Sequence, residues 1–364
     1  MTGPRSTGPL ATGTPVSPSQ VYDVALLDLD GVVYVGPDAV PGVPEALAVA
    51  RSAGMRLGFV TNNAARTPEQ VAEHLTELGI AAEPGDVITS SQAAATVVAE
   101  TFGPGARVLA VGGPGVAAAL GAAGLTVVGR AEDEPVAVVQ GYGREVGWAQ
   151  LAEAVVAVRN GARHVATNAD ATIPSPRGPL PGNGAMVGVV RDVTGQEPLI
   201  TGKPDPAMHA ECVRRTSARR PLVVGDRLDT DIEGASRAGA ASLLVLSGVT
   251  DPAVLLAAPP EHRPDLLAAD AAGMLQPHPA VVPDGRSWRC GVWTASAGEG
   301  RDVLVLEASG DPGGEDGLDG LRALCVAHWA RHPDQGSTAG VVASGPRAED
   351  AVIRWGLAAA DREG

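Results

Sequence analysis

Two aspartates that directly follow a short apolar run are the residues of this chain best suited to chemistry. The run 24–27 (Val-Ala-Leu-Leu) is typical of a buried strand in a parallel sheet, and Asp28-Leu29-Asp30-Gly31 comes next. Residues two apart in an extended chain face the same side, so both carboxylates can address one site, while Gly31 lets the backbone turn away. Two such carboxylates repel each other unless a cation lies between them or one of them is protonated. The pattern therefore predicts a metal site or an acid–base site, and a strand followed by an ordinary Asx turn is the alternative.

Polar residues follow other predicted strands in the same way. Thr61-Asn62-Asn63 follows a strand expected over 56–60, and Asp226 follows one expected over 222–224. Lys203 stands out because it is the only lysine among 27 basic residues. We interpret it as a position that requires a compact ammonium group, where the planar guanidinium of arginine does not fit. Taken singly, each pattern has an ordinary explanation: a turn, a helix N-cap, or the chance retention of one lysine.

The predicted elements alternate between strands and helices. Strands are expected at 24–27, 56–60, 108–111, 125–128, 136–139, 222–224, 242–246 and 265–268. Helices are expected at 44–53, 67–78 and 148–160, after Gly182, from about Pro206 and from Asp231. This alternation predicts an α/β protein with a Rossmann-like, doubly wound, mainly parallel sheet, which binds its ligands beyond the carboxyl ends of the strands. The candidate residues would then converge on one crevice.

Length and composition divide the chain into several parts. At 364 residues it is too long for one ordinary core. We expect a disordered tail at 1–20, which is rich in Gly, Pro, Ser and Thr, and a core built from 21–89 and 182–275. An α/β cap domain at 90–181 is inserted into this core, and a small α+β domain at 276–364, with four of the five tryptophans, follows it.

Charge and cysteine content restrict the partners. The formal net charge of −15 argues against nucleic acid or an anionic membrane surface as a partner. No segment approaches the roughly 20 apolar residues of a membrane-spanning helix, so no membrane insertion is expected. Three widely spaced cysteines outside any C-x-x-C pattern indicate a reducing compartment, and we expect a cytoplasmic protein without a thiol-bound zinc.

These residue types together suit phosphoryl transfer. Asp28 can attack phosphorus and form an aspartyl-phosphate, which divides one difficult step into two. Asp30 can protonate the leaving alcohol and later deprotonate the attacking water. Mg²⁺ prefers oxygen ligands, and Asp28, Asp226 and the backbone carbonyl of Asp30 suit it.

The remaining candidates would bind the phosphate or support the metal. The Thr61 hydroxyl and the Asn62 amide can donate hydrogen bonds to phosphoryl oxygens, and Asn63 lies beside them in the same predicted loop. Lys203 supplies a fixed positive charge for these oxygens. Asp231 is better placed one step away from the metal, where it would orient the site through water or through Lys203. The expected partner of such a site is a small phosphorylated metabolite.

Four runs of residues resemble the motifs of haloacid dehalogenase (HAD) superfamily phosphatases. They are D-x-D-G-V-x-Y, V-T-N-N-A-x-R-T-P, G-K-P-D-P and V-G-D-R-L-D-T-D-I-x-G-A, and they lie between about residues 21 and 274. Within the superfamily the chain is most similar to the large-capped branch of p-nitrophenylphosphatase and NagD-like enzymes. The resemblance implies that Asp28 is the nucleophile and that Asp30 is the acid–base. It also implies that Thr61 and Asn62 bind the phosphate. Lys203 would stabilise its charge, and Asp226 would bind magnesium.

The resemblance also bears on the substrate, which the cap would select. Segments 167–170 and 181–184 resemble family segments near the site, and Ile173 stands about where pyridoxal-phosphate phosphatases have a histidine. With its extra C-terminal region the chain is similar to glycerol-3-phosphate phosphatases of actinobacteria, which implies glycerol 3-phosphate or a related small ester. Nucleoside monophosphates and sugar phosphates are alternative substrates, and a catalytically idle metabolite sensor is the alternative function. A homo-oligomer formed through the cap is left open.

Three weaker patterns receive structural interpretations. The glycine-rich run 111–118 has the wrong spacing for a dinucleotide fingerprint, so we expect a strand, a turn and a helix inside the cap. His328 and His332 lie four apart near the end of a helix expected over 318–331, where we expect a solvated face rather than a metal pair. Related enzymes carry an acetyltransferase-like tail, but this chain has no R-x-x-G-x-G/A loop, so a packing or interaction domain is favoured.

Overall fold

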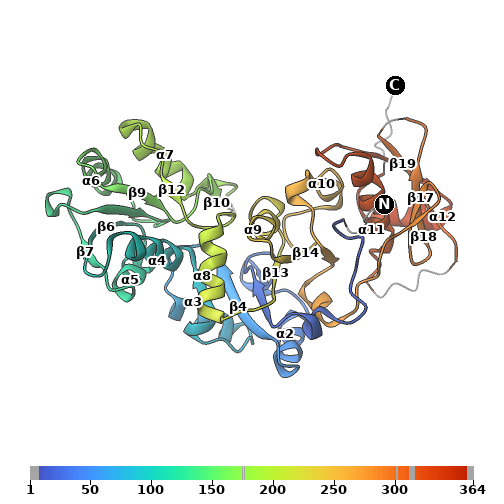
Figure 1. The fold of residues 1–364 in the computed structure, drawn as a ribbon, viewed down its shortest axis with the longest axis horizontal. Coiled ribbons are helices and arrows are strands. Elements are labelled where there is room, and N and C mark those ends of the chain that lie inside the picture. Colours follow the sequence, from blue (N-terminus) through green and yellow to red (C-terminus); the bar gives the residue numbers. More distant parts are fainter. Residues whose placement is uncertain (1–7, 174, 176, 301, 311–315, 359–364) are drawn as a thin grey trace, which may run out of the picture. The chain divides into compact units, whose positions relative to one another are not determined.

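The computed structural model describes residues 8–173, 175, 177–300, 302–310 and 316–358. They form two compact units, and Figure 1 shows the elements of each, coloured along the sequence. The first unit is formed by the described residues up to Leu57 and from Arg219 onward. The second unit is the continuous stretch between them, from Gly58 to Ala218.

Four parallel strands lie at the centre of the first unit. In spatial order they are β15 (Leu266–Ala268), β14 (Ala241–Val245), β13 (Pro221–Gly225) and β1 (Val24–Leu27). All four residues of β1 are buried, as its apolar run predicts. In the register of β1 and β13, Val24 lies opposite Pro221 and Leu27 lies opposite Val224. Both strands therefore end at the same edge of the sheet, and an aspartate follows each of them there.

Helices, short turns and one antiparallel pair of short strands accompany these strands. The elements are α1 (Pro18–Val21), β2 (Tyr34–Val35), β3 (Asp38–Ala39), α2 (Val43–Ser52), η3 (Leu228–Ile232), α9 (Glu233–Ala238), α10 (Pro252–Leu256), η4 (Pro260–His262) and η5 (Ala271–Leu275). Asp231 does not begin a helix as expected but lies inside the helical turn η3, directly before α9. The backbone N–H of Arg227 donates to the Asp231 carboxylate at 3.2 Å, so the chain already turns after Arg227.

The N-terminal segment differs from the disordered tail that the sequence predicts. Leu10 and Ala11 are buried within the apolar core of the first unit. Thr14 and His278 exchange two backbone hydrogen bonds, of 2.8 and 3.0 Å. The prediction fails for residues 8–20 because a few apolar side chains suffice to fix a short segment against an existing core. Residues 1–7 of the predicted tail lie outside the described residues.

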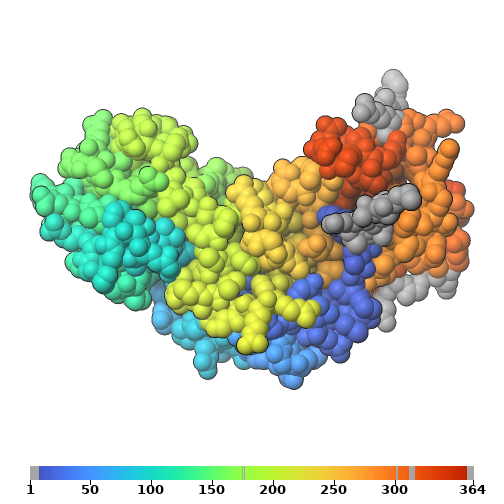
Figure 2. Space-filling model, in the orientation of Figure 1, coloured from blue at the N-terminus to red at the C-terminus, as the bar shows by residue number. Residues whose placement is uncertain are grey.

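The C-terminal part of the first unit is an α+β arrangement, as expected. Its five-stranded sheet has the order β16 (Val282–Asp284), β17 (Ser287–Cys290), β18 (Trp293–Ala297), β19 (Val303–Ala308) and β20 (Gly340–Ser344). Helices α11 (Asp319–Arg331) and α12 (Pro346–Arg354) pack on it. One apolar cluster joins Leu244 and Leu255 of the α/β part to Trp293, Leu304 and Leu324. In the space-filling view of Figure 2, the orange and red segments of this unit touch each other.

The two histidines near the end of α11 are not on a solvated face. Every residue from Asp319 to Trp329 is buried, because the helix is apolar nearly all round and is covered on several sides. The Nε2 atom of His328 lies 2.7 Å from the Ser337 carbonyl oxygen, and Nε2 of His332 lies 2.9 Å from the Asp302 carboxylate. Burial lowers the pKa of His328. The predicted solvated face is therefore wrong.

The second unit contains a five-stranded parallel sheet. Its order is β12 (Leu199–Ile200), β9 (Arg163–Ala166), β8 (Ala137–Gln140), β6 (Arg107–Val111) and β7 (Thr126–Val128). Helices α4 (Ser90–Phe102) and α5 (Pro114–Ala122) cover one face, and α6 (Trp148–Arg159) and α7 (Asn183–Thr194) cover the other. The strand, turn and helix expected for the glycine-rich run are confirmed as β6 and α5.

The second unit also holds the strand that ends at Thr61, the segment that carries Lys203, and several short elements. It includes β4 (Arg56–Thr61), which begins at the end of the first unit, α3 (Pro68–Glu77), η1 (Pro84–Asp86), β5 (Val87–Thr89), η2 (Ala131–Asp133), β10 (Thr172–Ile173), β11 (Leu180–Pro181) and α8 (Pro206–Thr216). Thr67 caps α3 in a capping box with Gln70, which confirms the predicted helix start. The structure places α7 and β12, which begin the predicted core segment 182–275, on the five-stranded sheet. The division into core, cap and C-terminal domain stays a prediction.

The helices of the described residues are short. The longest, α4 and α11, have 13 residues each. A bilayer-spanning helix needs about 20 apolar residues. Within the ranges that the structure describes, no helix is long and apolar enough to cross a membrane.

Candidate active site

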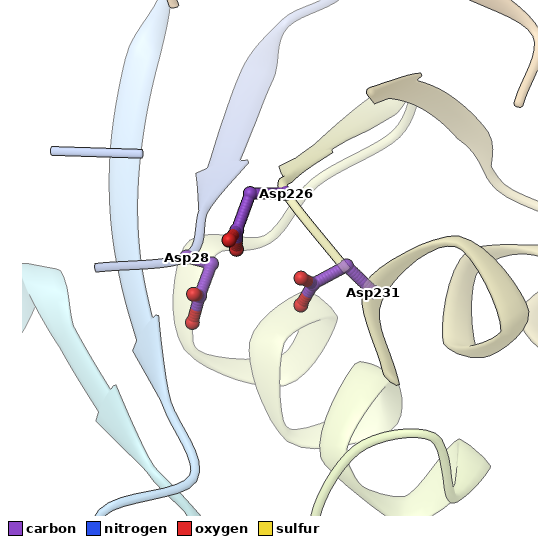
Figure 3. Close-up of side chains that lie close together, drawn as sticks. All are labelled: Asp28, Asp226 and Asp231. Carbon is purple, nitrogen blue, oxygen red and sulfur yellow. The ribbon is translucent and has the colours of Figure 1, made fainter. Parts of the chain in front are cut away.

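Three carboxylates meet at the carboxyl edge of the first unit's strands. One oxygen each of Asp28, Asp226 and Asp231 lies within 4.8 Å of the others (Figure 3). Asp28 follows β1, and its N–H donates to the Val224 carbonyl of β13 at 2.9 Å. That bond continues the β1–β13 register by one residue and brings Asp28 beside the end of β13, which Asp226 follows. The convergence expected from the sequence is present for Asp28 and Asp226.

The Asp226 carboxylate is held on several sides. The residue is fully buried, and the Val249 N–H donates to its Oδ2 atom at 2.7 Å. The Thr250 hydroxyl donates to its main-chain carbonyl at 2.6 Å. A Cβ at Gly31 would lie 2.4 Å from Asp226 Oδ2, and one at Gly248 would lie 2.0 Å from it. Only glycine leaves room at these two positions.

Asp231 lies closer to the other carboxylates than the sequence suggests. The sequence pattern predicts an orienting role one step from the metal, whereas one of the Asp231 oxygens belongs to the group of three. Its side chain packs flat on Gly225, where a Cβ would lie 2.2 Å from the Asp231 Cβ atom. Asp231 is therefore placed to contact a cation directly.

Asp30 stands apart from this cluster. Asp30 is exposed, whereas Asp28 is half-buried. The backbone of Asp30 forms an isolated β-bridge with that of Tyr34. Its carboxylate is not part of the group of three. A carboxylate outside the cation site can change its protonation during a reaction, which fits the acid–base role that the sequence predicts.

The predicted phosphate loop lies in the second unit, at the end of β4. The N–H of Asn63 donates to Thr61 Oγ1 at 3.0 Å, so the Thr61 hydroxyl keeps its own proton to donate. The side-chain oxygen of Asn63 accepts from the Ala65 N–H at 2.9 Å. Asn63 thus shapes the loop through an Asx turn, a contact that adds to its predicted role toward phosphate.

Asn62 connects this loop to Lys203. Its Oδ1 atom accepts from the Lys203 N–H at 2.9 Å, and its Nδ2 atom donates to the Lys203 carbonyl at 3.2 Å. The same Nδ2 atom lies 3.5 Å from an Asp170 carboxylate oxygen. The Asn62 side chain therefore fixes the backbone of Lys203, whose ammonium donates to the Val60 carbonyl at 3.4 Å. The phosphate-binding role assigned to the Asn62 amide stays a prediction.

The structure thus gathers the predicted residues in two sets, one in each unit. The first unit holds Asp28, Asp226 and Asp231, and the second unit holds the Thr61–Asn63 loop and Lys203. Sequence reasoning missed the tight contact of Gly248 with Asp226. The only signal for it is a glycine three residues after β14, the strand that neighbours β13, in Leu246-Ser247-Gly248-Val249.

Three family models match consecutive parts of the chain. The model of haloacid dehalogenase-like hydrolases matches residues 25–126, and a HAD-hydrolase-like model matches residues 200–274. A GCN5-related N-acetyltransferase like domain matches residues 290–357, which cover most of the C-terminal α+β part.

One relative matches nearly the whole chain, and others match about two thirds of it. It is 43% identical to the D-glycerol 3-phosphate phosphatase of Mycobacterium tuberculosis over 351 residues, 94% of this chain and 96% of the relative. Acid sugar phosphatases of Staphylococcus aureus are 40% identical over 232 residues, 63% of this chain and 88% of theirs.

Solved structures of phosphatases are also similar to this chain. The crystal structure of the glycerol phosphate phosphatase from Mycobacterium tuberculosis in complex with magnesium has a TM-score of 0.84 and 43% identity, over 94% of this chain and 99% of that one. A p-nitrophenyl phosphatase from Archaeoglobus fulgidus has a TM-score of 0.64 and 28% identity, over 70% and 98%. With its aspartate cluster and these relatives, the chain belongs to the haloacid dehalogenase-like hydrolases.

Proposed function

We propose that this protein is a magnesium-dependent phosphatase that hydrolyses a small phosphate monoester through an aspartyl-phosphate on Asp28. The observation that carries the proposal is the cluster of Asp28, Asp226 and Asp231 at the ends of neighbouring parallel strands. The similarity to a D-glycerol 3-phosphate phosphatase over 94% of this chain makes glycerol 3-phosphate the leading substrate.

The donor set of the cluster fits magnesium. Three carboxylates whose oxygens lie within 4.8 Å of one another repel strongly unless a cation neutralises them. They offer only hard oxygen ligands, which Mg²⁺ prefers. Asp28, Asp226 and Asp231 would hold the ion, and the Asp30 carbonyl belongs to the predicted set. When bound, the ion supplies positive charge that offsets the charge of the transferred phosphoryl group.

The two aspartates of the first motif divide the reaction between them. A carboxylate oxygen of Asp28 attacks phosphorus, the ester P–O bond breaks, and Asp30 gives its proton to the departing alkoxide. In the second half Asp30 takes a proton from water as that water attacks the aspartyl-phosphate. The new P–O bond forms, the bond to Asp28 breaks, and inorganic phosphate leaves with both aspartates restored.

The second unit would supply the phosphate contacts. We propose that Lys203 and the Thr61 hydroxyl bind the oxygens of the phosphoryl group that is transferred to Asp28. The ammonium offsets negative charge on the phosphoryl oxygens, and the hydroxyl proton remains available because Thr61 Oγ1 accepts rather than donates toward Asn63. Removing Lys203 should therefore weaken both phosphate binding and turnover.

Sugar phosphates form the second candidate substrate class. The 40% identity to acid sugar phosphatases favours them, although that match spans 63% of this chain.

A cytoplasmic location is also part of the proposal, and three buried thiols outside any disulfide support it: Cys212, Cys290 and Cys325. Burial raises the pKa of Cys212 to about 12, so this thiol stays protonated.

Phosphate release tests the proposal. Wild type and Asp28→Asn are assayed on glycerol 3-phosphate, a hexose phosphate and AMP, with magnesium or with EDTA. We expect release that requires magnesium and that Asp28→Asn abolishes while its circular dichroism spectrum is unchanged. The ester with the highest kcat/KM identifies the substrate class. If the folded wild-type protein releases no phosphate from any ester in magnesium, the phosphatase proposal is wrong and a sensor function takes its place.

A further inference from the structure

A second asparagine, Asn168, holds the loop that binds Lys203. Its Nδ2 atom donates to the Asn62 main-chain carbonyl at 2.6 Å, and Ser90 Oγ donates to the same oxygen at 2.8 Å. Asn168 is 4% exposed, so water does not compete for this bond. Asn62 is therefore fixed at its backbone by Asn168 and Ser90, while its side chain holds Lys203.

A third asparagine, Asn183, holds Asn168 in turn. Its Nδ2 atom donates to the Asn168 main-chain carbonyl at 2.9 Å and to the Gln140 carbonyl at 3.3 Å. Asn183 is the first residue of α7 and is 2% exposed. One chain of amide contacts thus runs from the start of α7 through Asn168 and Asn62 to Lys203, entirely within the second unit.

The backbone beside Lys203 leaves little freedom to absorb a change in this chain. A Cβ at Gly202 would lie 2.2 Å from the Thr167 carbonyl oxygen and 2.6 Å from Asn62 Oδ1. The Thr201 N–H donates to the Ala166 carbonyl at 3.1 Å, which continues the β9–β12 pairing. The segment that carries Lys203 is thus packed directly against the segment that carries Asn168.

We propose that Asn168 and Asn183 are positioning residues that set the place of the Lys203 ammonium through Asn62. The proposal rests on the function proposed above for Lys203. Neither asparagine needs to touch the substrate, because Asn183 holds the backbone of Asn168 and Asn168 holds the backbone of Asn62, whose side chain binds the backbone of Lys203. A misplacement of about 1 Å can cost about 100-fold in rate, so kcat/KM should fall about 10- to 100-fold in Asn168→Ala and Asn183→Ala.

The only lysine of the chain provides a direct readout of its position. Growth with ¹⁵N-lysine labels the backbone amide of Lys203 alone, and that N–H donates to Asn62 Oδ1. We expect the single amide signal to shift and its hydrogen exchange to become at least about tenfold faster in Asn168→Ala and Asn183→Ala. Asn160→Ala is the matched control, because Asn160 is an exposed asparagine of the same unit. In this variant the amide signal of Lys203 should stay unchanged.

A double-mutant cycle tests whether the asparagines act through the lysine. If they do, Asn168→Ala lowers kcat/KM in the wild-type background but has little further effect in Lys203→Ala. Equal losses in both backgrounds, or an unchanged Lys203 amide signal, would overturn the inference. If Asn168→Ala does not fold, Asn183→Ala carries the same cycle.

The two proposals fail in different ways. An inactive wild-type protein, or a Lys203→Ala variant with wild-type kcat/KM, refutes the function proposed for Lys203. The amide signal then still decides whether the asparagines place that residue. Wild-type kcat/KM in Asn168→Ala together with a large loss in Lys203→Ala refutes only the positioning role.

Discussion

Alanine at Gly248 would displace the most deeply buried carboxylate of the site. The Cβ of that alanine would lie 2.0 Å from Asp226 Oδ2 and 2.5 Å from its Cγ atom, whereas real Cβ contacts essentially never fall below 3.0 Å. The two groups must therefore separate by at least about 1 Å. Gly248 is not among the residues with positive φ, so the substitution adds this steric conflict without backbone strain.

The expected magnitude follows from how Asp226 is held. The residue is fully buried and its Oδ2 atom accepts from the Val249 N–H at 2.7 Å, so the carboxylate cannot move into open space. A shift of about 1 Å at a reacting centre can cost about 100-fold in rate. Overpacking of this kind also costs about 1–3 kcal/mol of stability. We expect kcat to fall about 100-fold and the half-saturating magnesium concentration to rise.

The assay is phosphate release at saturating ester across a magnesium titration, together with urea unfolding. Gly121→Ala serves as the control, because Gly121 lies in α5 and a methyl group added there would have no atom of another part of the chain within 4 Å. This control should leave the magnesium titration unchanged and should raise the free energy of unfolding by up to about 1 kcal/mol, because alanine favours a helix more than glycine does. A Gly248→Ala protein with wild-type kcat and wild-type magnesium dependence would refute the argument that the position of Asp226 controls the site.

Three further predictions concern other parts of the molecule. Asp30→Asn should lower kcat by about 10²- to 10⁴-fold and leave magnesium affinity, measured by calorimetry, unchanged, because the Asp30 carboxylate lies outside the cluster. Arg322→Leu should lower the free energy of unfolding in urea by about 3–5 kcal/mol, because Arg322 is 2% exposed and pairs with Asp316 and Asp319; a loss below about 1 kcal/mol would contradict this. Burial lowers the pKa of His164 to about 4, so the unfolded chain binds this proton first, and stability is lost as the pH falls from about 6.5 towards 4. Between pH 7.5 and 5 the wild-type protein should therefore lose about 2 kcal/mol more than His164→Gln, and equal losses would count against the buried neutral histidine.

The carboxylate cluster could be predicted from the sequence to a large extent. Asp28 and Asp226 each follow a short apolar run, and neighbouring parallel strands end at one edge of a sheet, so their convergence needs no knowledge of the loops. Asp231 was harder to place. Its position depends on the turn that starts at Arg227, and an aspartate at a helix start and one inside a tight helical turn have the same local sequence pattern.

Other features could not be predicted because they depend on contacts between distant segments. The bond from Asn168 to Asn62 joins residues 106 apart, and neither residue belongs to a periodic pattern. The burial of α11 could have been predicted, since apolar residues lie on nearly all of its sides, but the pair of histidines suggested a polar face. Leu10 and Ala11 lie in a stretch whose composition is typical of disorder, and only the core they join reveals their role.

The first unit is built from an early and a late stretch of the chain, which affects the order in which the protein can fold during synthesis. The second unit is a continuous stretch that ends at Ala218, so all of its residues are synthesised before the last third of the chain. The strand β1 must wait for β13 to form its sheet, and Leu244 and Leu255 must wait for Trp293 and the residues beyond it. Until then a newly made chain exposes apolar surface that later residues cover. The first unit is therefore the part of this protein that depends on complete translation, and a chain that stops before Asp226 lacks the carboxylate cluster.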